Sequence, residues 1–279
     1  MEQKFAGESA SVRAGMLAVD TEFAVCDSGS VFINSAFGVP PTISQIAGLP
    51  IWPLATPGAR LEAGRGPWLV RAGVYGGNAG DEVITNRRGT RFHLNSETGA
   101  LFIAESAWQA NHDNDATGLR AAYKVGGYYD TGEFADLRAD RVKHKGNWGI
   151  YGIADQQVFR ERSSKNNQGL SLFARASAVP DDRNEAAWYL EGGAVYKGLL
   201  ENRDEDVLGI GLSYTKISRE IPPVSAGPTR HETILEWTYH AVVNEHLCIQ
   251  PDFQLIFNPG AVSEADTAIV AGVRFIAEY

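Results

Sequence analysis

Apolar and polar residues alternate along most of the chain, in runs that end at polar or glycine- and proline-rich breaks. Alternation with a period of two predicts β-strands that have one apolar and one polar face. Such runs cover 9–17, 57–63, 67–76, 100–108, 117–128, 147–159, 168–178, 187–198, 206–217, 231–242, 246–257 and 267–278. The pattern therefore predicts an all-β chain of about twelve antiparallel strands, each near the roughly 9–11 residues of a tilted membrane strand.

The polar side of these strands is charged on strand after strand. In 231–242, for example, Leu235 and Trp237 oppose Glu232 and Glu236. The same side carries Arg13, Arg60, Glu62, Arg71, Glu105, Arg120, Lys124, Asp155, Arg175, Glu191, Glu236, Asp252 and Arg274. Two architectures fit this pattern. The charged side faces bulk water in a soluble β-sandwich, whereas it lines the lumen in an outer-membrane β-barrel whose apolar side meets lipid.

The connections between the predicted strands differ in length. The breaks at 18–56, 77–99 and 129–146 are long, whereas 64–66 and 243–245 are short. Outer-membrane barrels have short periplasmic turns and longer outer loops. If long and short connections alternate between the two sides of the membrane, the last strand ends on the periplasmic side, at the aromatic Tyr279.

The segment 18–56 does not alternate. It contains four prolines, which strand ladders exclude, and it also contains Phe23, Phe32, Phe37 and Trp52. A loop this apolar must be buried against something, and long irregular loops are usually functional. In a barrel the place for it is the lumen, so we expect an inward-folded loop that narrows the pore. The alternative is a loop that covers the end of a sandwich, or a short helix near 42–47.

The composition excludes several classes of function. The net charge of −9 argues against a nucleic-acid partner, which usually requires a basic face. The two cysteines and six histidines show no spacing typical of a metal site or of a nucleophile–base pair, so we expect no cofactor and no enzymatic activity. No stretch approaches the roughly 20 apolar residues of a membrane helix. The N-terminal sequence MEQKFAGESAS is polar and is not a signal peptide.

Several segments, in order along almost the whole chain, resemble the carbohydrate-selective porins of the OprB type. They are VRAGMLAVDTEFA, FINSAFGVPP, NWGIYGIADQQVFR, GLSLFARASAVPDDRN, QPDFQLIFNPG and VAGVRFIAEY, of which NSAFG and QPDFQLIFNPG are the most specific. The resemblance implies a single domain over 1–279 within an up-and-down transmembrane barrel of sixteen strands in the bacterial outer membrane. Such porins pass monosaccharides, glucose above all, by diffusion, and 18–56 corresponds to their constriction loop.

The same comparison implies that about four N-terminal strands and a signal peptide precede the part matched here. To close the sheet, the first predicted strand would then have to pair with 267–278, because an open edge in lipid is very costly.

Side-chain parity and the resemblance together give a set of candidate pore-lining residues. A sugar needs flat rings for its C–H faces and polar groups for its hydroxyls. From the inward loop we expect Asp20, Glu22, Phe23, Asn34 and Trp52 to provide them. From the facing wall we expect Arg13, Arg60, Arg71, Arg120 and Lys124. Arginines opposite loop carboxylates would set a transverse field across the pore.

The expected partners follow from the interpretation of the chain as an outer-membrane porin. They are small sugars as permeant solutes, outer-membrane lipid around the barrel, and the barrel-assembly machinery through the C-terminal strand ending at Tyr279. The oligomeric state is open, a homo-oligomer included. The rival interpretations are a soluble all-β carbohydrate-binding module, an enzyme housed in a barrel, and a truncated porin that does not function. The near-uniform strand lengths and the terminal aromatic favour a channel over the soluble module.

Overall fold

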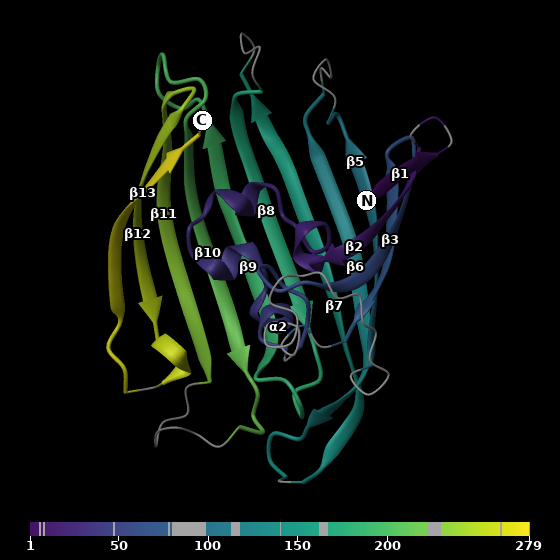
Figure 1. Cartoon of the computed structure of the whole chain (residues 1–279). Helices are drawn as coiled ribbons and strands as arrows, with labels where there is room; N and C mark the ends of the chain where they lie inside the picture. The colour runs from purple at the N-terminus through teal and green to yellow at the C-terminus, as the bar shows by residue number, and fades with distance from the viewer. Residues whose placement is uncertain are drawn as a thin grey trace.

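In the part of the chain that the structure describes, thirteen strands form one antiparallel sheet in which every strand pairs with its neighbours in sequence. The computed structural model describes residues 1–5, 7, 9–46, 48–77, 79, 99–112, 118–139, 141–161, 167–221, 230–262 and 264–278. The strands are β1 Glu2–Phe5, β2 Ala10–Leu17, β3 Thr56–Arg65, β4 Trp68–Gly76, β5 Ala100–Ala110, β6 Ala121–Ala135, β7 Lys143–Arg160, β8 Gly169–Ala178, β9 Ala186–Lys197, β10 Val207–Ile217, β11 His231–Asn244, β12 Leu247–Phe257 and β13 Ala268–Ala277. The predicted all-β, up-and-down fold is confirmed, and the sheet curves around a concave face (Figure 1).

The structure differs from the sequence prediction at three places. First, β1 is an additional strand whose four residues are too few to show alternation. Second, β6 and β7 extend toward each other, so the connection predicted over 129–146 shortens to 136–142. Third, the predicted pairing of 9–17 with 267–278 is wrong. The strand at 9–17 is β2, which lies between β1 and β3, whereas β13 pairs with β12 alone in the described part of the chain. Tyr279 lies outside the described residues.

The two faces of the sheet have the polarity opposite to that of a soluble protein. Apolar side chains on the outer face are open to solvent, as for Val125, which is 65% exposed, and Phe275, which is 69% exposed. On the inner face, by contrast, Arg60, Arg175 and Glu236 are almost completely buried. A sheet in water would bury the apolar face instead. The exposed apolar face is what a sheet needs when its outer solvent is lipid.

Aromatic side chains gather toward both ends of the outer face. At one end Trp68 and Trp108 are register partners on β4 and β5, and Trp108 stacks on Tyr123 with a centroid distance of 5.8 Å. At the opposite end of the strands Trp188 stacks on Tyr214 at 5.0 Å. Rings in two rows with aliphatic residues between them match the girdles that flank the lipid-facing band of outer-membrane barrels.

The hydrophobic core lies between the concave face and the segment from Ala18 to Ala55, which we call the inward segment (Figure 1). This segment contains the short helices η1 Val19–Thr21, η2 Ser28–Val31, α1 Ser35–Gly38 and α2 Pro41–Ser44, and η3 Pro259–Ala261 precedes β13. No helix in the described ranges is long and apolar enough to cross a membrane. The predicted inward fold is confirmed, and the short helix considered near 42–47 is α2.

Aromatic rings fill the core from both sides. Phe32 and Phe37 of the inward segment stack on each other at 4.6 Å, and Phe32 also contacts Phe173 of β8 at 5.7 Å. The close approach depends on Gly211 of β10, because a Cβ atom there would lie 2.8 Å from both rings. Tyr128 of β6 also lies in this core. The inward segment is therefore packed against the sheet and does not hang free in the lumen.

Candidate functional site

A cluster of arginines on the sheet holds the start of the inward segment. Arg60 donates from Nε and Nη2 to one carboxylate oxygen of Glu22, at 2.9 and 2.5 Å. Arg13 forms an ion pair with the same oxygen at 3.3 Å, and Arg71 donates to the Glu22 carbonyl at 2.9 Å. The structure thus brings four of the predicted site residues together. Charge-assisted hydrogen bonds between guanidinium and carboxylate groups are short and strong, so this cluster fixes the position of the segment.

The next residues of the segment bond to the wall through their backbone. Glu105 of β5 accepts a hydrogen bond from the Ala24 N–H at 3.0 Å, and Lys124 of β6 donates to the Val25 carbonyl at 2.8 Å. Irregular backbone has few partners of its own, so buried N–H and C=O groups must be satisfied by side chains. Lys124, predicted to face the solute, is used in this way.

Arg175 of β8 is the central anchor of the inward segment. Its side chain is fully buried and forms an ion pair with Glu191 at 2.9 Å. The same guanidinium donates to three carbonyl oxygens of the segment, those of Ala24 at 2.7 Å, Phe37 at 2.8 Å and Gly38 at 3.1 Å. A buried cation is tolerated only when its donors are paired in this manner. Arg175 therefore joins two parts of the segment that lie more than ten residues apart in sequence.

Glu236 of β11 also holds the inward segment, but it does so with an anionic side chain that accepts from backbone N–H groups. Its carboxylate accepts from the backbone N–H groups of Ile33 at 2.6 Å and Asn34 at 3.1 Å. The Asn34 side chain accepts from the Ala36 N–H at 3.1 Å, which caps α1, and donates to Gln254 at 2.9 Å. Capping is a common role of asparagine at helix N-termini. The structure therefore places Asn34 in a bonded position between the segment and the wall.

The remaining predicted residues of the segment lie in different surroundings. Phe23 is only 2% exposed and packs edge-on against Tyr75 with ring centroids 6.5 Å apart, so a solute cannot reach its ring. Asp20 accepts a hydrogen bond from the Trp52 N–H at 3.0 Å. Trp52 itself is 72% exposed. Of the two aromatic residues predicted to meet a sugar, only Trp52 presents an open ring.

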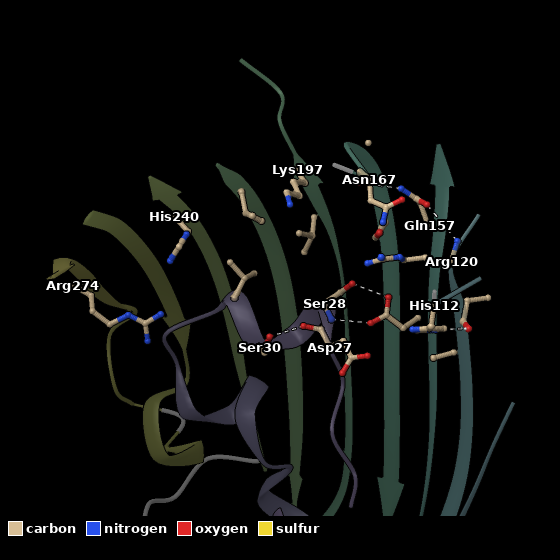
Figure 2. A pocket seen from close by; sticks show the side chains of 18 residues that line it. Asp27, Ser28, Ser30, His112, Arg120, Gln157, Asn167, Lys197, His240 and Arg274 are labelled. Atoms are coloured by element: carbon tan, nitrogen blue, oxygen red, sulfur yellow. Dashed lines mark hydrogen bonds between the residues drawn. The ribbon is translucent and has the colours of Figure 1, made fainter. Parts of the chain in front are cut away.

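A polar cavity of about 530 Å³ lies on the side of η2 that faces the start of β6 and the end of β7 (Figure 2). We call it the basic cavity, because it is lined by Arg120, Lys197, His240 and Arg274. Uncharged donors and acceptors also reach it, from Gln157 on β7 and from the neighbouring Asn167 and Ser171. Groups of this kind can exchange hydrogen bonds with the hydroxyls of a sugar.

The floor of the basic cavity is held by Asp155 of β7. Its carboxylate accepts from the Ser28 N–H at 2.8 Å and from the Ser28 hydroxyl at 2.7 Å (Figure 2). The thiol of Cys26 lies 3.8 Å from the same carboxylate. Burial, with a smaller contribution from Asp155, raises the pKa of Cys26 to about 12. The thiol therefore stays protonated while the segment is docked.

A second cavity of about 490 Å³ lies on the other side of the inward segment. It is lined by Ile46 of the segment and by residues at the opposite ends of the strands, among them Phe134, Lys143, Arg183 and Glu185. Because the segment lies between two polar cavities at opposite ends of the sheet, a solute that moves along the concave face must pass it. In the described part of the chain no cluster of three His, Cys, Asp or Glu residues is arranged to hold a metal ion.

Sequence reasoning found only part of the cavity lining. Arg120 was predicted and lines the basic cavity, whereas Lys197, His240 and Arg274 were not selected. The alternation of side chains along each strand could have identified these residues. Lys197 is six residues from Glu191, so both side chains share the inner face of β9.

Comparison with known proteins agrees with this geometry. The model of the family described as "Carbohydrate-selective porin, OprB family" matches residues 1–279. Porin B of Pseudomonas aeruginosa is 26% identical over 252 residues, which are 80% of this chain and 55% of that protein. The high-pH structure of Pseudomonas putida OprB superposes with a TM-score of 0.85 at 24% identity, over 99% of this chain and 71% of the other. Its low-pH structure gives 0.62 at 21% identity, over 99% and 64%. The chain thus spans about half the length of the curated relatives it matches.

Proposed function

Because the chain belongs to the carbohydrate-selective porin family OprB and so to the bacterial outer membrane, we propose that it provides a pore for the passive diffusion of carbohydrates, monosaccharides such as glucose included. One observation carries the proposal. An apolar face points outward, a charged face points inward, and the inward segment is bonded across the charged face between two polar cavities. Lipid against the outer face and recognition of the last strand by the assembly machinery belong to the same proposal.

The inward segment acts as the constriction in this proposal. A docked loop fixes the width of the passage only if it cannot move, and the contacts of Arg60, Glu105, Arg175 and Glu236 provide that rigidity. Glu22, Asn34, Arg71 and Lys124 then shape the passage indirectly, by holding the segment. This differs from the direct contact with solute expected from the sequence.

Direct contact with the solute falls to groups that are open to the cavities. Arg120, Asn167 and Ser171 offer hydrogen bonds at the basic cavity, and Trp52 offers an exposed ring on the segment. Binding at these groups must remain weak, because a permeant solute has to leave as readily as it enters. Partly hydrated side chains of this kind suit weak and repeated exchange better than a closed pocket would.

Conductance in planar lipid bilayers tests the proposal. We expect discrete channels whose ion current falls as glucose is added, since a sugar that occupies the passage obstructs ions. A Trp52→Ala variant should weaken this effect of glucose, whereas Trp148→Ala, which removes an aromatic ring from the outer face, should leave it unchanged. Channels that are indifferent to every sugar would exclude a carbohydrate passage, and the lack of any channel would exclude a pore.

A soluble carbohydrate-binding module is the rival function. It requires the outer face to be compatible with water, yet large apolar residues are exposed there from β3 to β13. Exposed apolar area on that scale marks contact with lipid or with a partner. A monodisperse protein in detergent-free buffer would support the rival, whereas we expect aggregation without detergent.

A further inference from the structure

The charged groups of the basic cavity do not balance one another. Three permanent cations line it, Arg120, Lys197 and Arg274, against two carboxylates, Asp27 and Asp155. Unequal charge in a cavity with few other counterions attracts solutes of the opposite sign. Which of these charges is available to a solute depends on the contacts that each already makes.

Two of the charges are already engaged. Both oxygens of Asp155 accept hydrogen bonds from Ser28, at 2.8 and 2.7 Å. Lys197 forms an ion pair with Glu205 at 2.7 Å. The ion pair neutralises Lys197, whereas the hydrogen bonds from the neutral Ser28 occupy the oxygens of Asp155 without cancelling its charge. Arg120 and Arg274 are therefore the cations that remain available to a solute.

The two arginines have no carboxylate partner in the described ranges. Arg120 has a buried Nε without a hydrogen-bond partner. Arg274 donates to the side-chain oxygen of Gln250, at 3.1 Å from Nε and 2.5 Å from Nη2, and this neutral contact orients it without neutralising it. Both arginines thus keep a full positive charge at the surface of the cavity.

The arginines enter the cavity from opposite sides. Arg120 precedes β6 and Arg274 lies on β13, and Figure 2 shows their guanidinium groups directed toward each other across the space above Ser28 and Ser30. A guanidinium group offers planar paired donors that match the two oxygens of a carboxylate. Asn167 lies near Arg120 in Figure 2, and its side-chain amide can accept from or donate to hydroxyl groups.

We propose that the basic cavity is a binding site for acidic sugars, that is, polyhydroxylated carboxylates such as gluconate, and that it binds them more tightly than the neutral sugar. The carboxylate of the solute contacts Arg120 or Arg274, and its hydroxyls exchange hydrogen bonds with Asn167 and Ser171. The inference rests on the proposed function, because it names a class of solute for the same passage.

Equilibrium dialysis of the refolded protein in detergent micelles tests the site with radiolabelled gluconate and glucose as probes. We expect gluconate to bind more tightly than glucose at low salt, with the difference shrinking as potassium chloride is added. Arg274→Gln should weaken gluconate binding by about 2- to 5-fold, the contribution of a partly exposed ion pair, and should leave glucose binding unchanged, whereas Arg120→Gln should weaken the binding of gluconate more than that of glucose. Arg120→Lys, which keeps the charge, should retain most of the affinity for gluconate.

The matched control is Arg138→Gln. Arg138 is an exposed arginine in the connection 136–142, far along the strands from the basic cavity, and its partner Glu220 is at 2.7 Å. This control should bind gluconate like the unaltered protein. Equal binding of gluconate and glucose, or an equal loss in the control and in Arg120→Gln, would overturn the inference.

The outcome is separable from that of the proposed function. Channels that respond to glucose while gluconate binds no better than glucose would leave the porin in place and refute the acidic-sugar site. Tight and arginine-dependent binding of gluconate in a protein that forms no channel would uphold the site and refute the pore.

Discussion

The role of Arg175 as the central anchor of the inward segment leads to the most specific prediction. Replacing it with methionine keeps an unbranched apolar stem, removes three hydrogen bonds to the carbonyls of Ala24, Phe37 and Gly38, and leaves Glu191 buried without its cation. Removing one partner of a buried ion pair costs about 3–5 kcal/mol. The free energy that separates the docked segment from an undocked one should therefore fall by about that amount.

The reactivity of Cys26 reports this change. The thiol belongs to the segment and is buried on the side that faces the sheet, and its raised pKa keeps it protonated, so a maleimide reagent can label it only when the segment opens. When reclosing is faster than labelling, the rate follows the population of the open form. A loss of about 3–5 kcal/mol then accelerates labelling by roughly 100- to 5,000-fold. A Cys248→Ser background ensures that only Cys26 is counted.

Two controls separate anchoring from general destabilisation. Arg138→Met removes an exposed arginine of the outer connection and should leave the labelling rate unchanged. Arg175→Met with Glu191→Leu removes the stranded carboxylate and should recover part of the loss, because an apolar pair often replaces a buried ion pair well. Labelling of Cys26 in Arg175→Met within a few-fold of the unaltered rate would refute the assignment of Arg175 as an anchor.

Three further predictions concern other parts of the molecule. Val125→Arg places a charge on the outer face and should lower the free energy of unfolding in lipid by about 2–4 kcal/mol in urea titrations; an unchanged value would mean that this face does not meet lipid. Gly211→Val should push Phe32 and Phe37 off the sheet and change single-channel conductance, whereas an unchanged conductance would contradict their packing on β10. His144, together with the N–H groups of Ala139 and Arg138, lowers the pKa of Asp136 to about 2. Since the folded pKa lies below the unfolded value, this stabilisation is complete above about pH 4 and is lost as the pH falls toward 2. The NMR shifts of the Arg138 and Ala139 amides should change in that range, and a change nearer neutral pH would exclude the contact.

The sequence predicted the membrane strands well because alternate residues must be apolar, where they face outward, and polar, where they face inward. Each strand from β2 to β13 overlaps a predicted run. The prediction failed where that constraint is weak. β1 is too short to show a pattern, and in the β6–β7 hairpin the pairs Glu133–Lys145 and Phe134–His144 lie beyond the alternating part of both strands.

The candidate site was predicted less completely, because the inward segment has no periodicity. Its content of apolar residues indicated burial, and the predicted opposition of Glu22 to wall arginines agrees with the contact to Arg60. Without a repeating pattern, nothing in the sequence indicates which side of the segment meets the sheet. For this reason Phe23 and Trp52 received the same expectation, although one lies in the core and the other is exposed.

The influx of solutes into proteoliposomes tests the central claim most directly, because it requires both a pore and a preference for carbohydrates. Liposomes that contain the protein are placed in isotonic solutions of glucose or of a neutral non-sugar solute of equal size, and swelling is followed by light scattering. We expect faster swelling in glucose than in the size-matched solute. Equal rates would contradict a carbohydrate-selective passage, and no swelling above that of protein-free liposomes would contradict a pore.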